Sequence, residues 1–466
     1  MAVIYMDRAS IESLTEEDIR KIVDENTTDT KYGYLYDYYK GKHKILDETK
    51  KDSTAPNNRL VNNMARYITD TATGYFIGQP VVYTSKNEKF LQVMQDIFNY
   101  NDEQDHNLEL SKACSICGSC FEMLYMDEEA KIRLARVPAQ YGIMICETDS
   151  GFQAPMAFIR TILSRDKNKN VIRKVEFWNA AVVMYFKSVN GSCLTLEAVA
   201  EHYWQDVPFV EYVNNEERMG DFEGVITEID AYNRVQSNTA NYFQYNDDAI
   251  LKVMKLGEVE SQDIADMKEK GAIILEDGGD VDWLLKQIDD TAQENYKNRL
   301  REDMHTMANV PHLCDESFGG NLTGVAISYK LWGLDQMCSI KERKFKKGLQ
   351  RRNELITNIL RVMGYQYDYR ELIPKFRRNR PQNDLETAQI VTTLSNDLSR
   401  ETRLQMISSV EDVQEELERL EKEKKQDQEE FGVYENFARA FHTPQEDPGE
   451  GKFQNKVTAD ESAGEK

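Results

Sequence analysis

Apolar side chains recur with two different periods along the chain, and the period changes from one part to the next. In residues 57–120 they step by three or four, as at Leu60, Met64 and Ile68, which predicts amphipathic helices. From 156 to 257 the pattern is β-rich: apolar and polar residues alternate in short runs, which predicts strands separated by polar turns, before a helical stretch from about 221. We expect helices at 14–25 (with Thr15 as N-cap), 57–74, 88–100, 102–120 and 221–247, and strands at 81–84, 121–145, 157–163, 171–178, 182–188 and 207–212, with a small hairpin of 273–275 and 281–284.

The last third of the chain is predicted to be mainly helical. A helix over 291–307 precedes a much longer one over 325–363, whose apolar positions step by three, four or seven, the spacing of a helix packed along one side. At ~1.5 Å per residue the long helix spans roughly 60 Å, and Gly364 is placed to end it. The remaining expected elements are a strand at 365–369, helices at 384–396 and 413–428, and a helix opened by Ser399 as N-cap.

Acidic residues outnumber basic ones, 81 to 58 among 466 residues, which gives a net charge of −23. High affinity for nucleic acid comes from Lys and Arg side chains that neutralise its phosphates. The charge therefore argues against a protein that grips DNA over its whole surface, but not against one that lets DNA slide past. No apolar run approaches the ~20 residues that cross a bilayer, and the first residues do not form a signal peptide. With seven scattered cysteines, we expect a protein of a reducing cytoplasm without membrane contact.

Motifs for metal, phosphate or nucleophilic chemistry are weak. Cys114, Cys117 and Cys120 form a CxxCxxC run, but zinc sites usually need a second ligand pair, so we expect the three thiols to pack as small apolar groups along one side of a helix. The loop Gly319–Gly324 lacks the Gly-Lys-Ser/Thr ending of a phosphate-binding loop. We expect neither enzymatic activity nor a cofactor. Two alternatives remain open: a nucleic-acid-processing enzyme with an acidic metal site and a helical accessory domain, and a helical scaffold protein.

Two basic clusters contrast with the acidic whole. The first runs through Lys341–Arg352 on the predicted long helix. The second follows that helix and consists of Arg370, Lys375, Arg377, Arg378 and Arg380. The functional interpretation is contact with DNA phosphates or with an acidic patch on a partner. The structural interpretation is a solvated face, or charges that pair with the acids of a neighbouring subunit.

Six groups of short segments occur in a fixed order over most of residues 55–425. They are Asn58–Asn63 with Gly74–Pro80, Pro208–Asp221, Ile229–Asn233 with Asn238–Asn241, Gly320–Ala326, Ser399–Thr402 and Ile407–Glu418. Each segment alone is a weak signal. Together, and in this order, they resemble the portal proteins of siphophages, specifically the SPP1-like branch.

The resemblance implies an α+β portal fold that assembles as a ring, usually of twelve subunits, around a central tunnel. It implies a mixed α/β wing, long stem helices, a small clip and a helical crown. The parts would be the wing at 1–320 (β-rich around 156–260), the first stem helix at 321–364, the clip at 365–383, the return stem helix and tunnel loop at 384–400, and crown helices at 401–444. The acidic tail at 445–466 is poor in large apolar residues, which predicts disorder.

The resemblance also implies a function and a set of partners. The ring would sit at one capsid vertex of a virion, after assembly in the bacterial cytoplasm, and double-stranded DNA would pass through it without sequence specificity. Its partners would be further copies of itself, the terminase large subunit, a head-completion adaptor, and the major capsid and scaffold proteins. The implied DNA-facing tunnel loop is Ser395, Asn396, Asp397, Leu398, Ser399 and Arg400. The second basic cluster would lie in the clip, where it would meet motor, adaptor or DNA.

Overall fold

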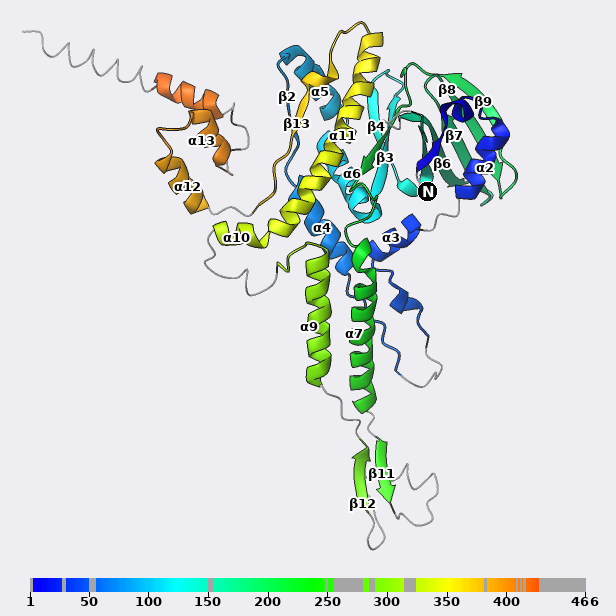
Figure 1. The fold of residues 1–466 in the computed structure, drawn as a ribbon, viewed down its shortest axis with the longest axis vertical. Coiled ribbons are helices and arrows are strands. Elements are labelled where there is room, and N and C mark those ends of the chain that lie inside the picture. The colour runs from blue at the N-terminus through cyan, green and yellow to red at the C-terminus, as the bar shows by residue number, and fades with distance from the viewer. Residues whose placement is uncertain are drawn as a thin grey trace, which may run out of the picture. The chain divides into compact units, whose positions relative to one another are not determined.

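A computed structural model describes the fold of most of the chain (Figure 1). It describes residues 3–26, 31–49, 56–149, 154–247, 250–254, 280–284, 290–313, 324–380, 384–407, 410, 413 and 416–426. The chain divides into two compact units, 1–380 and 381–466. The strand expected at 273–275, the glycine-rich loop at 319–323 and the acidic tail at 445–466 lie outside the described residues.

A six-stranded sheet forms the β-rich part of the first unit. Its first strand, β1 (Val3–Met6), runs parallel to β5 (Gly142–Glu147), and every other pair of adjacent strands in this sheet is antiparallel. Helices α1 (Arg8–Glu12) and α2 (Glu16–Asn26) cover one face, where Ile19 and Val23 pack against Phe177. The strands lie in the order β1 (Val3–Met6), β5 (Gly142–Glu147), β6 (Pro155–Arg165), β7 (Val171–Trp178), β8 (Val182–Val189) and β9 (Thr195–Glu201).

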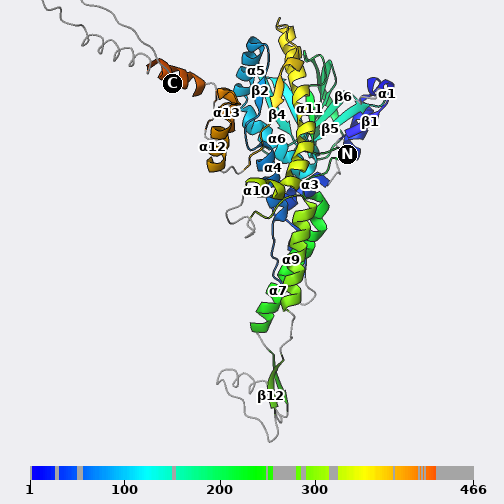
Figure 2. The same ribbon diagram turned by 60° about the vertical axis from the view of Figure 1, so that its left-hand side comes forward.

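The larger core of the first unit lies between a three-stranded antiparallel sheet and the helices around it. The strand order is β10 (Phe209–Val213), β3 (Ser119–Met126) and β4 (Ile132–Val137). The long helix α11 (Trp332–Val362) lies on this sheet, where it contacts β10, and it is seen along its length in Figure 2. The surrounding helices are α3 (Lys31–Tyr39), α4 (Met64–Ile77), α5 (Glu88–Tyr100), α6 (Glu103–Cys117) and α11 (Trp332–Val362).

Two further helices of the first unit, α7 (Ile226–Asp247) and α9 (Asp290–Met307), run side by side in both views (Figures 1 and 2). The Thr239 hydroxyl lies 3.1 Å from Gln293 Oε1 and joins them. Strand β12 (Asp280–Leu284) confirms the strand expected at 281–284. It pairs antiparallel with β11 (Ile250–Met254).

The long helix is present but broken once. α10 (Gly324–Lys330) and α11 meet at Leu331, whose backbone angles are φ −87° and ψ −1°. Gly364 follows the end of α11 with φ 97°, a left-handed conformation that glycine adopts without strain. The Tyr365 N–H then donates a hydrogen bond to the Leu360 carbonyl oxygen at 2.9 Å. The predicted glycine cap is therefore confirmed.

The strand expected at 365–369 is wrong. Residues 365–368 have no regular structure, and Tyr369–Glu371 form a 3-10 helix. The alternating tyrosines pack by ring contacts instead: Tyr367 stacks on Phe90 with ring centroids 4.8 Å apart. The strand of this region comes later, as β13 (Ile373–Lys375), which pairs antiparallel with β2 (Val82–Thr84).

The second unit contains α12 (Asp384–Thr393), α13 (Arg400–Met406) and a helical stretch at 416–426. The predicted N-cap is confirmed, because the Ser399 hydroxyl accepts a hydrogen bond from the Thr402 N–H at 3.2 Å. An equivalent N-cap is confirmed in the first unit at Thr15. There the Thr15 and Asp18 side chains each accept from the other's backbone N–H, the reciprocal arrangement of a capping box.

Gly348 allows α11 to approach β10 closely, and this gives a prediction. A Cβ at Gly348 would lie 2.5 Å from ring carbons of the buried Tyr212, whereas a Cβ at Gly74 in α4 would meet nothing within 4 Å. Alanine gains about 0.5–1 kcal/mol over glycine in a helix, but overpacking a core costs about 1–3 kcal/mol. We expect Gly348→Ala to lower the free energy of unfolding by about 1–2 kcal/mol, and Gly74→Ala to raise it by up to about 1 kcal/mol. Urea unfolding of both variants tests this, and equal effects would contradict it.

Candidate nucleic-acid interface

The first basic cluster does not form one solvated face, because two of its cations are buried. Arg352 is fully buried. Its Nη1 lies 2.8 Å from Glu103 Oε1, and its Nε donates to Glu122 Oε2 at 2.9 Å. Arg352 thereby links α11 to the start of α6 and to the middle of β3. The expectation of a solvated or intersubunit role is wrong for Arg352, whose two partners lie in its own chain.

Further polar groups complete this buried site, which we call the Arg352 cluster: Arg352, Glu103, Glu122, His106, Tyr83 and Tyr212. Tyr212 donates from its hydroxyl to Glu122 Oε2 at 2.9 Å, and His106 Nε2 lies 2.8 Å from Glu122 Oε1. The Tyr83 hydroxyl donates to Glu103 at 2.6 Å. Burial alone would raise the pKa of Glu122, but the adjacent Arg352 charge and the His106 contact outweigh it and lower that pKa to about 2. The carboxylate therefore stays ionised in the core.

Lys341 is the second buried cation of the first cluster. Its ammonium group contacts the carboxylate of Asp221 and donates to the Ser115 hydroxyl at 2.8 Å. Asp221 is also held by Asn214, whose side-chain amide donates to Oδ1 at 2.8 Å. Lys341 and Arg352 are eleven residues apart, which is about three helical turns. The two ion pairs therefore fix α11 at two points along its length.

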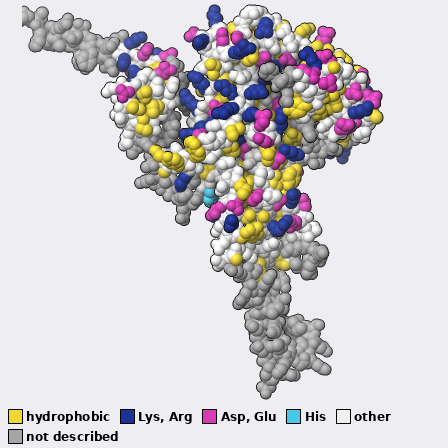
Figure 3. Space-filling model, viewed as in Figure 1, with side chains coloured by type: hydrophobic (Ala, Val, Ile, Leu, Met, Phe, Trp, Pro, Cys, Tyr) yellow, Lys and Arg dark blue, Asp and Glu magenta, His cyan; other side chains and the backbone are white. Residues whose placement is uncertain are grey.

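The other cations of the first cluster lie at the surface, where Figure 3 shows a group of basic side chains over α11. Several of them are already paired: Lys344 with Glu216, and Arg351 with Asp206 at 2.7 Å. They line a hollow of about 480 Å³ between α11, β10 and the ends of β5 and β6. Because the cations of the hollow are largely neutralised by carboxylates, it is poorly suited to bind a phosphate.

In the second basic cluster, two cations form ion pairs with α11 and the other three are exposed. Arg378 lies 2.7 Å from Glu342, and Arg380 lies 2.9 Å from Asp335. These two cations hold the chain that leaves α11 against the side of that helix. The other members, Arg370, Lys375 and Arg377, are exposed. The structure thus leaves three of the five predicted residues open to a partner.

The segment predicted to face DNA is a compact turn between α12 and α13. The Asp397 N–H donates to the Leu394 carbonyl oxygen at 3.1 Å, and the Leu398 N–H donates to the same oxygen at 3.2 Å. Asn396, Asp397 and Ser399 are exposed, and Ser395, Leu398 and Arg400 are half-buried. The six residues therefore form the turn and the start of α13, with one acid and one base.

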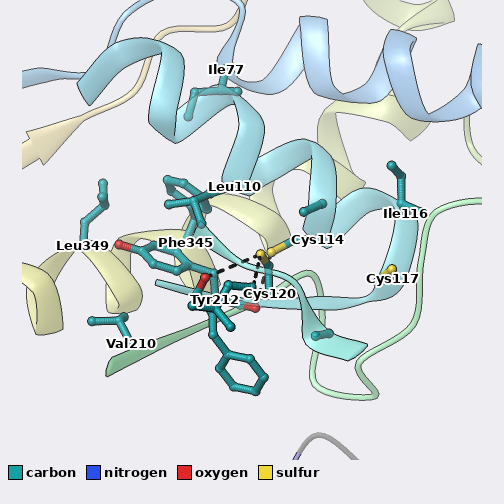
Figure 4. Close-up of a cluster of buried hydrophobic side chains, with 14 of the residues drawn as sticks. Ile77, Leu110, Cys114, Ile116, Cys117, Cys120, Val210, Tyr212, Phe345 and Leu349 are labelled. Carbon is teal, nitrogen blue, oxygen red and sulfur yellow. Dashed lines mark hydrogen bonds between the residues drawn. The ribbon is translucent and has the colours of Figure 1, made fainter. Parts of the chain in front are cut away.

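The three closely spaced cysteines are buried in the core between α6 and the three-stranded sheet (Figure 4). Their packing role is confirmed, but not their common helix: Gly118 ends α6 with φ 80°, and Cys120 lies on β3. Burial raises the pKa of all three thiols, that of Cys120 to about 12. Each thiol is therefore held in its protonated, weakly nucleophilic form.

Among the residues that the structure describes, no group of three or more His, Cys, Asp or Glu side chains is arranged to hold a metal ion. Likewise, within the described ranges no helix is both long and apolar enough to cross a membrane.

Sequence reasoning missed the buried acids, Glu103, Glu122 and Asp221. A signal was available for Glu122, because it is the single charged residue of an otherwise apolar strand, β3. A charge inside such a strand needs a partner of opposite sign. The sequence does not indicate which distant cation supplies it, since Arg352 lies 230 residues away.

The residues of this chain that match known proteins lie in both compact units. The chain matches the family described as "Phage portal protein, SPP1 Gp6-like" over residues 19–430. It is 26% identical over 428 residues to the portal protein of Bacillus phage SPP1, an alignment that covers 88% of this chain and 83% of the relative. It is 26% identical over 418 residues to the portal protein of Clostridium phage phiCD119, with 83% of this chain and 91% of the relative covered.

Proposed function

Because the chain belongs to the SPP1 Gp6-like family of phage portal proteins, we propose that it closes into a ring of twelve copies around a DNA tunnel. As a portal protein it is the head–tail connector of a tailed phage. The observation that carries the proposal is the family match, which runs from residue 19 to residue 430. A match of that extent supports a portal role for both compact units of the chain.

In the proposed ring each subunit makes a head-to-tail contact with the next. Such a contact closes into a ring when the rotation between neighbours divides a full turn. The wing is 1–320, the first stem helix 321–364, the clip 365–383, the return stem helix and tunnel loop 384–400, and the crown 401–444. A helix that lines the tunnel must stay fixed within its subunit while DNA moves past it. The two buried ion pairs of α11 support that role for the first stem helix.

The ring occupies one vertex of the capsid, after assembly in the host cytoplasm. It contacts the major capsid and scaffold proteins there, docks the terminase large subunit during packaging, and later seats a head-completion adaptor. The turn Ser395–Arg400 faces the DNA. Its single acid and single base suit a weak, sequence-independent contact with phosphates.

The alternative of a nucleic-acid-processing enzyme fits the structure less well. Two-metal chemistry needs carboxylates that are free to bind metal ions. Glu103 and Glu122 lie together at Arg352, but both are buried and both are paired with it. They are therefore part of the core and closed to substrate.

The exposed clip cations give a functional test. We expect a triple variant, Arg370→Gln with Lys375→Gln and Arg377→Gln, to lower DNA packaging, because three exposed positive charges are lost from the proposed motor-facing end. Nuclease-protected DNA per capsid measures the effect, and electron microscopy checks that rings still form. Lys21→Gln, a similarly exposed site on α2, is the control. Packaging equal to the control would contradict the assigned role of these residues.

The position of the protein in the particle tests the function itself. Gold-labelled antibody against this chain should mark one vertex in each capsid of the phage that encodes it. Labelling over the whole capsid surface, or no label on intact particles, would contradict the proposal.

A further inference from the structure

Large apolar side chains are exposed in a row along α10 and the first half of α11. Val325 is 62% exposed, Tyr329 77%, Trp332 62% and Ile340 52%. Val325 and Tyr329 lie four residues apart on α10, and Trp332 and Ile340 lie eight residues apart on α11, so each pair lies on one face of its own helix. Figure 3 shows hydrophobic surface over this part of the fold. We call these four residues the α10–α11 stripe.

The short helix α10 has no stabilising core of its own. It contains seven residues, and none of those whose burial is described, Val325–Lys330, is buried. A helix this short is marginal in water, because its stability has to come from packing of its apolar face. Ile327 packs against the larger core, but Val325 and Tyr329 face outward. Another surface is therefore needed to complete the packing.

Charge favours a second copy of the same chain as that surface. α11 carries eight basic and three acidic residues on a chain whose net charge is −23, and four of those cations (Lys341, Lys344, Arg351 and Arg352) pair with acids of their own chain. The net charge of the residues outside α11 is therefore more negative than that of the whole chain. Beyond the stripe, the cations Arg343 and Lys347 are exposed on α11. A neighbouring copy carries the same net charge of −23, which is electrostatically complementary to these cations.

We propose that the α10–α11 stripe is buried by the adjacent copy of this chain in the portal ring. This inference rests on the proposed ring and goes beyond it by naming one of its two contact faces. Because a head-to-tail contact joins two different surfaces, the stripe packs against a distinct, acidic surface of its neighbour. Trp332 and Tyr329 form the centre of the contact, as large aromatic side chains commonly do in interfaces.

Photo-cross-linking of the full-length protein identifies what covers the stripe. With p-benzoylphenylalanine placed at position 332, irradiated rings should give covalent dimers and higher multimers on a denaturing gel. Mass spectrometry of the cross-linked peptides should join position 332 to a second chain. Cross-links confined to residues 381–466 of the same chain would assign the stripe to that unit and overturn the proposal, and so would the absence of any cross-link.

A double substitution tests whether the stripe is needed for assembly. Tyr329→Glu with Trp332→Glu places two charges in the proposed contact, and we expect the ring population to fall at least tenfold. The unfolding temperature should stay near that of the wild type, because both side chains are exposed. The control is Tyr203→Glu, at a tyrosine that is 74% exposed elsewhere on the first unit, and it should keep its rings.

The possible outcomes separate this inference from the proposed function. If the wild type forms rings and the double variant forms them equally well, the stripe assignment fails and the portal ring stands. If the control loses its rings to the same degree, the effect is not specific to the stripe and the assignment also fails. If the wild type forms no ring with coat and scaffold proteins present, the ring itself fails, and the inference fails with it.

Discussion

Arg352→Ala should lower the free energy of unfolding by about 3–5 kcal/mol, because it leaves two buried carboxylates without their cation. Glu103 and Glu122 both lie within 2.9 Å of the guanidinium in the folded protein. Most proteins are stable by only about 5–15 kcal/mol, so the variant should be largely unfolded at temperatures the wild type tolerates. Urea unfolding followed by circular dichroism measures the loss.

Two controls separate the effect of losing a buried cation from the effect of losing any positive charge on α11. Arg343→Ala removes an exposed cation of the same helix and should change stability by less than about 0.5 kcal/mol. Arg352→Lys keeps the charge, but a lysine cannot form the forked contact with two carboxylates, so most of the loss should remain. A change at Arg352 no larger than that at Arg343 would show that the cluster does not hold α11.

The pH dependence of stability reports on the same cluster. The pKa of Glu122 is lowered to about 2 in the folded protein, below its unfolded value of about 4.3. Its ionised form is therefore favoured by folding. The stabilisation is present above about pH 4.3 and is lost as the pH falls through about 2. The difference in stability between the wild type and Glu122→Gln should shrink over that window, and a constant difference would contradict the ion pair.

Lys341→Met is expected to lower the free energy of unfolding by about 3–5 kcal/mol, because it leaves Asp221 as an unpaired buried charge. Lys341 and Asp221 are both almost completely buried. The double variant Lys341→Met with Asp221→Asn removes both charges, and it should recover part of the loss because the remaining amide can still hydrogen-bond. Thermal and urea unfolding of the single and double variants measure the coupling between the two residues.

An exposed pair on the same helix is the matched control. Lys344 contacts Glu216, whose side chain is largely exposed. Lys344→Met should therefore change stability by less than about 1 kcal/mol. If the double variant at Lys341 and Asp221 were no more stable than Lys341→Met alone, the ion pair would not be the reason for the loss.

Local sequence signals predicted the elements well where side-chain period and caps agree. The helices α5 and α9 and the strands β7 and β8 lie close to their expected ranges, and the caps at Thr15, Ser399 and Gly364 are confirmed. β9 was missed, because almost all of its side chains are exposed. Such an edge strand has no buried face to create an alternating pattern.

The candidate site was harder to predict, because its contacts join distant parts of the chain. A run of lysines and arginines on a helix has the same pattern whether each side chain faces solvent or the core. Only tertiary structure separates the buried Lys341 and Arg352 from their exposed neighbours, since Asp221 and Glu122 are more than 100 residues away. The family was recognisable from the order of short segments, which does not depend on those contacts.

The central claim is that this protein is a portal subunit, and its oligomeric state tests that claim most directly. We would measure the mass of the purified full-length protein by native mass spectrometry, with negative-stain images of the same sample, alone and after co-expression with coat and scaffold proteins. The account predicts a closed ring of about twelve 54.0 kDa subunits with a central hole. A monomer or dimer in both conditions would contradict it.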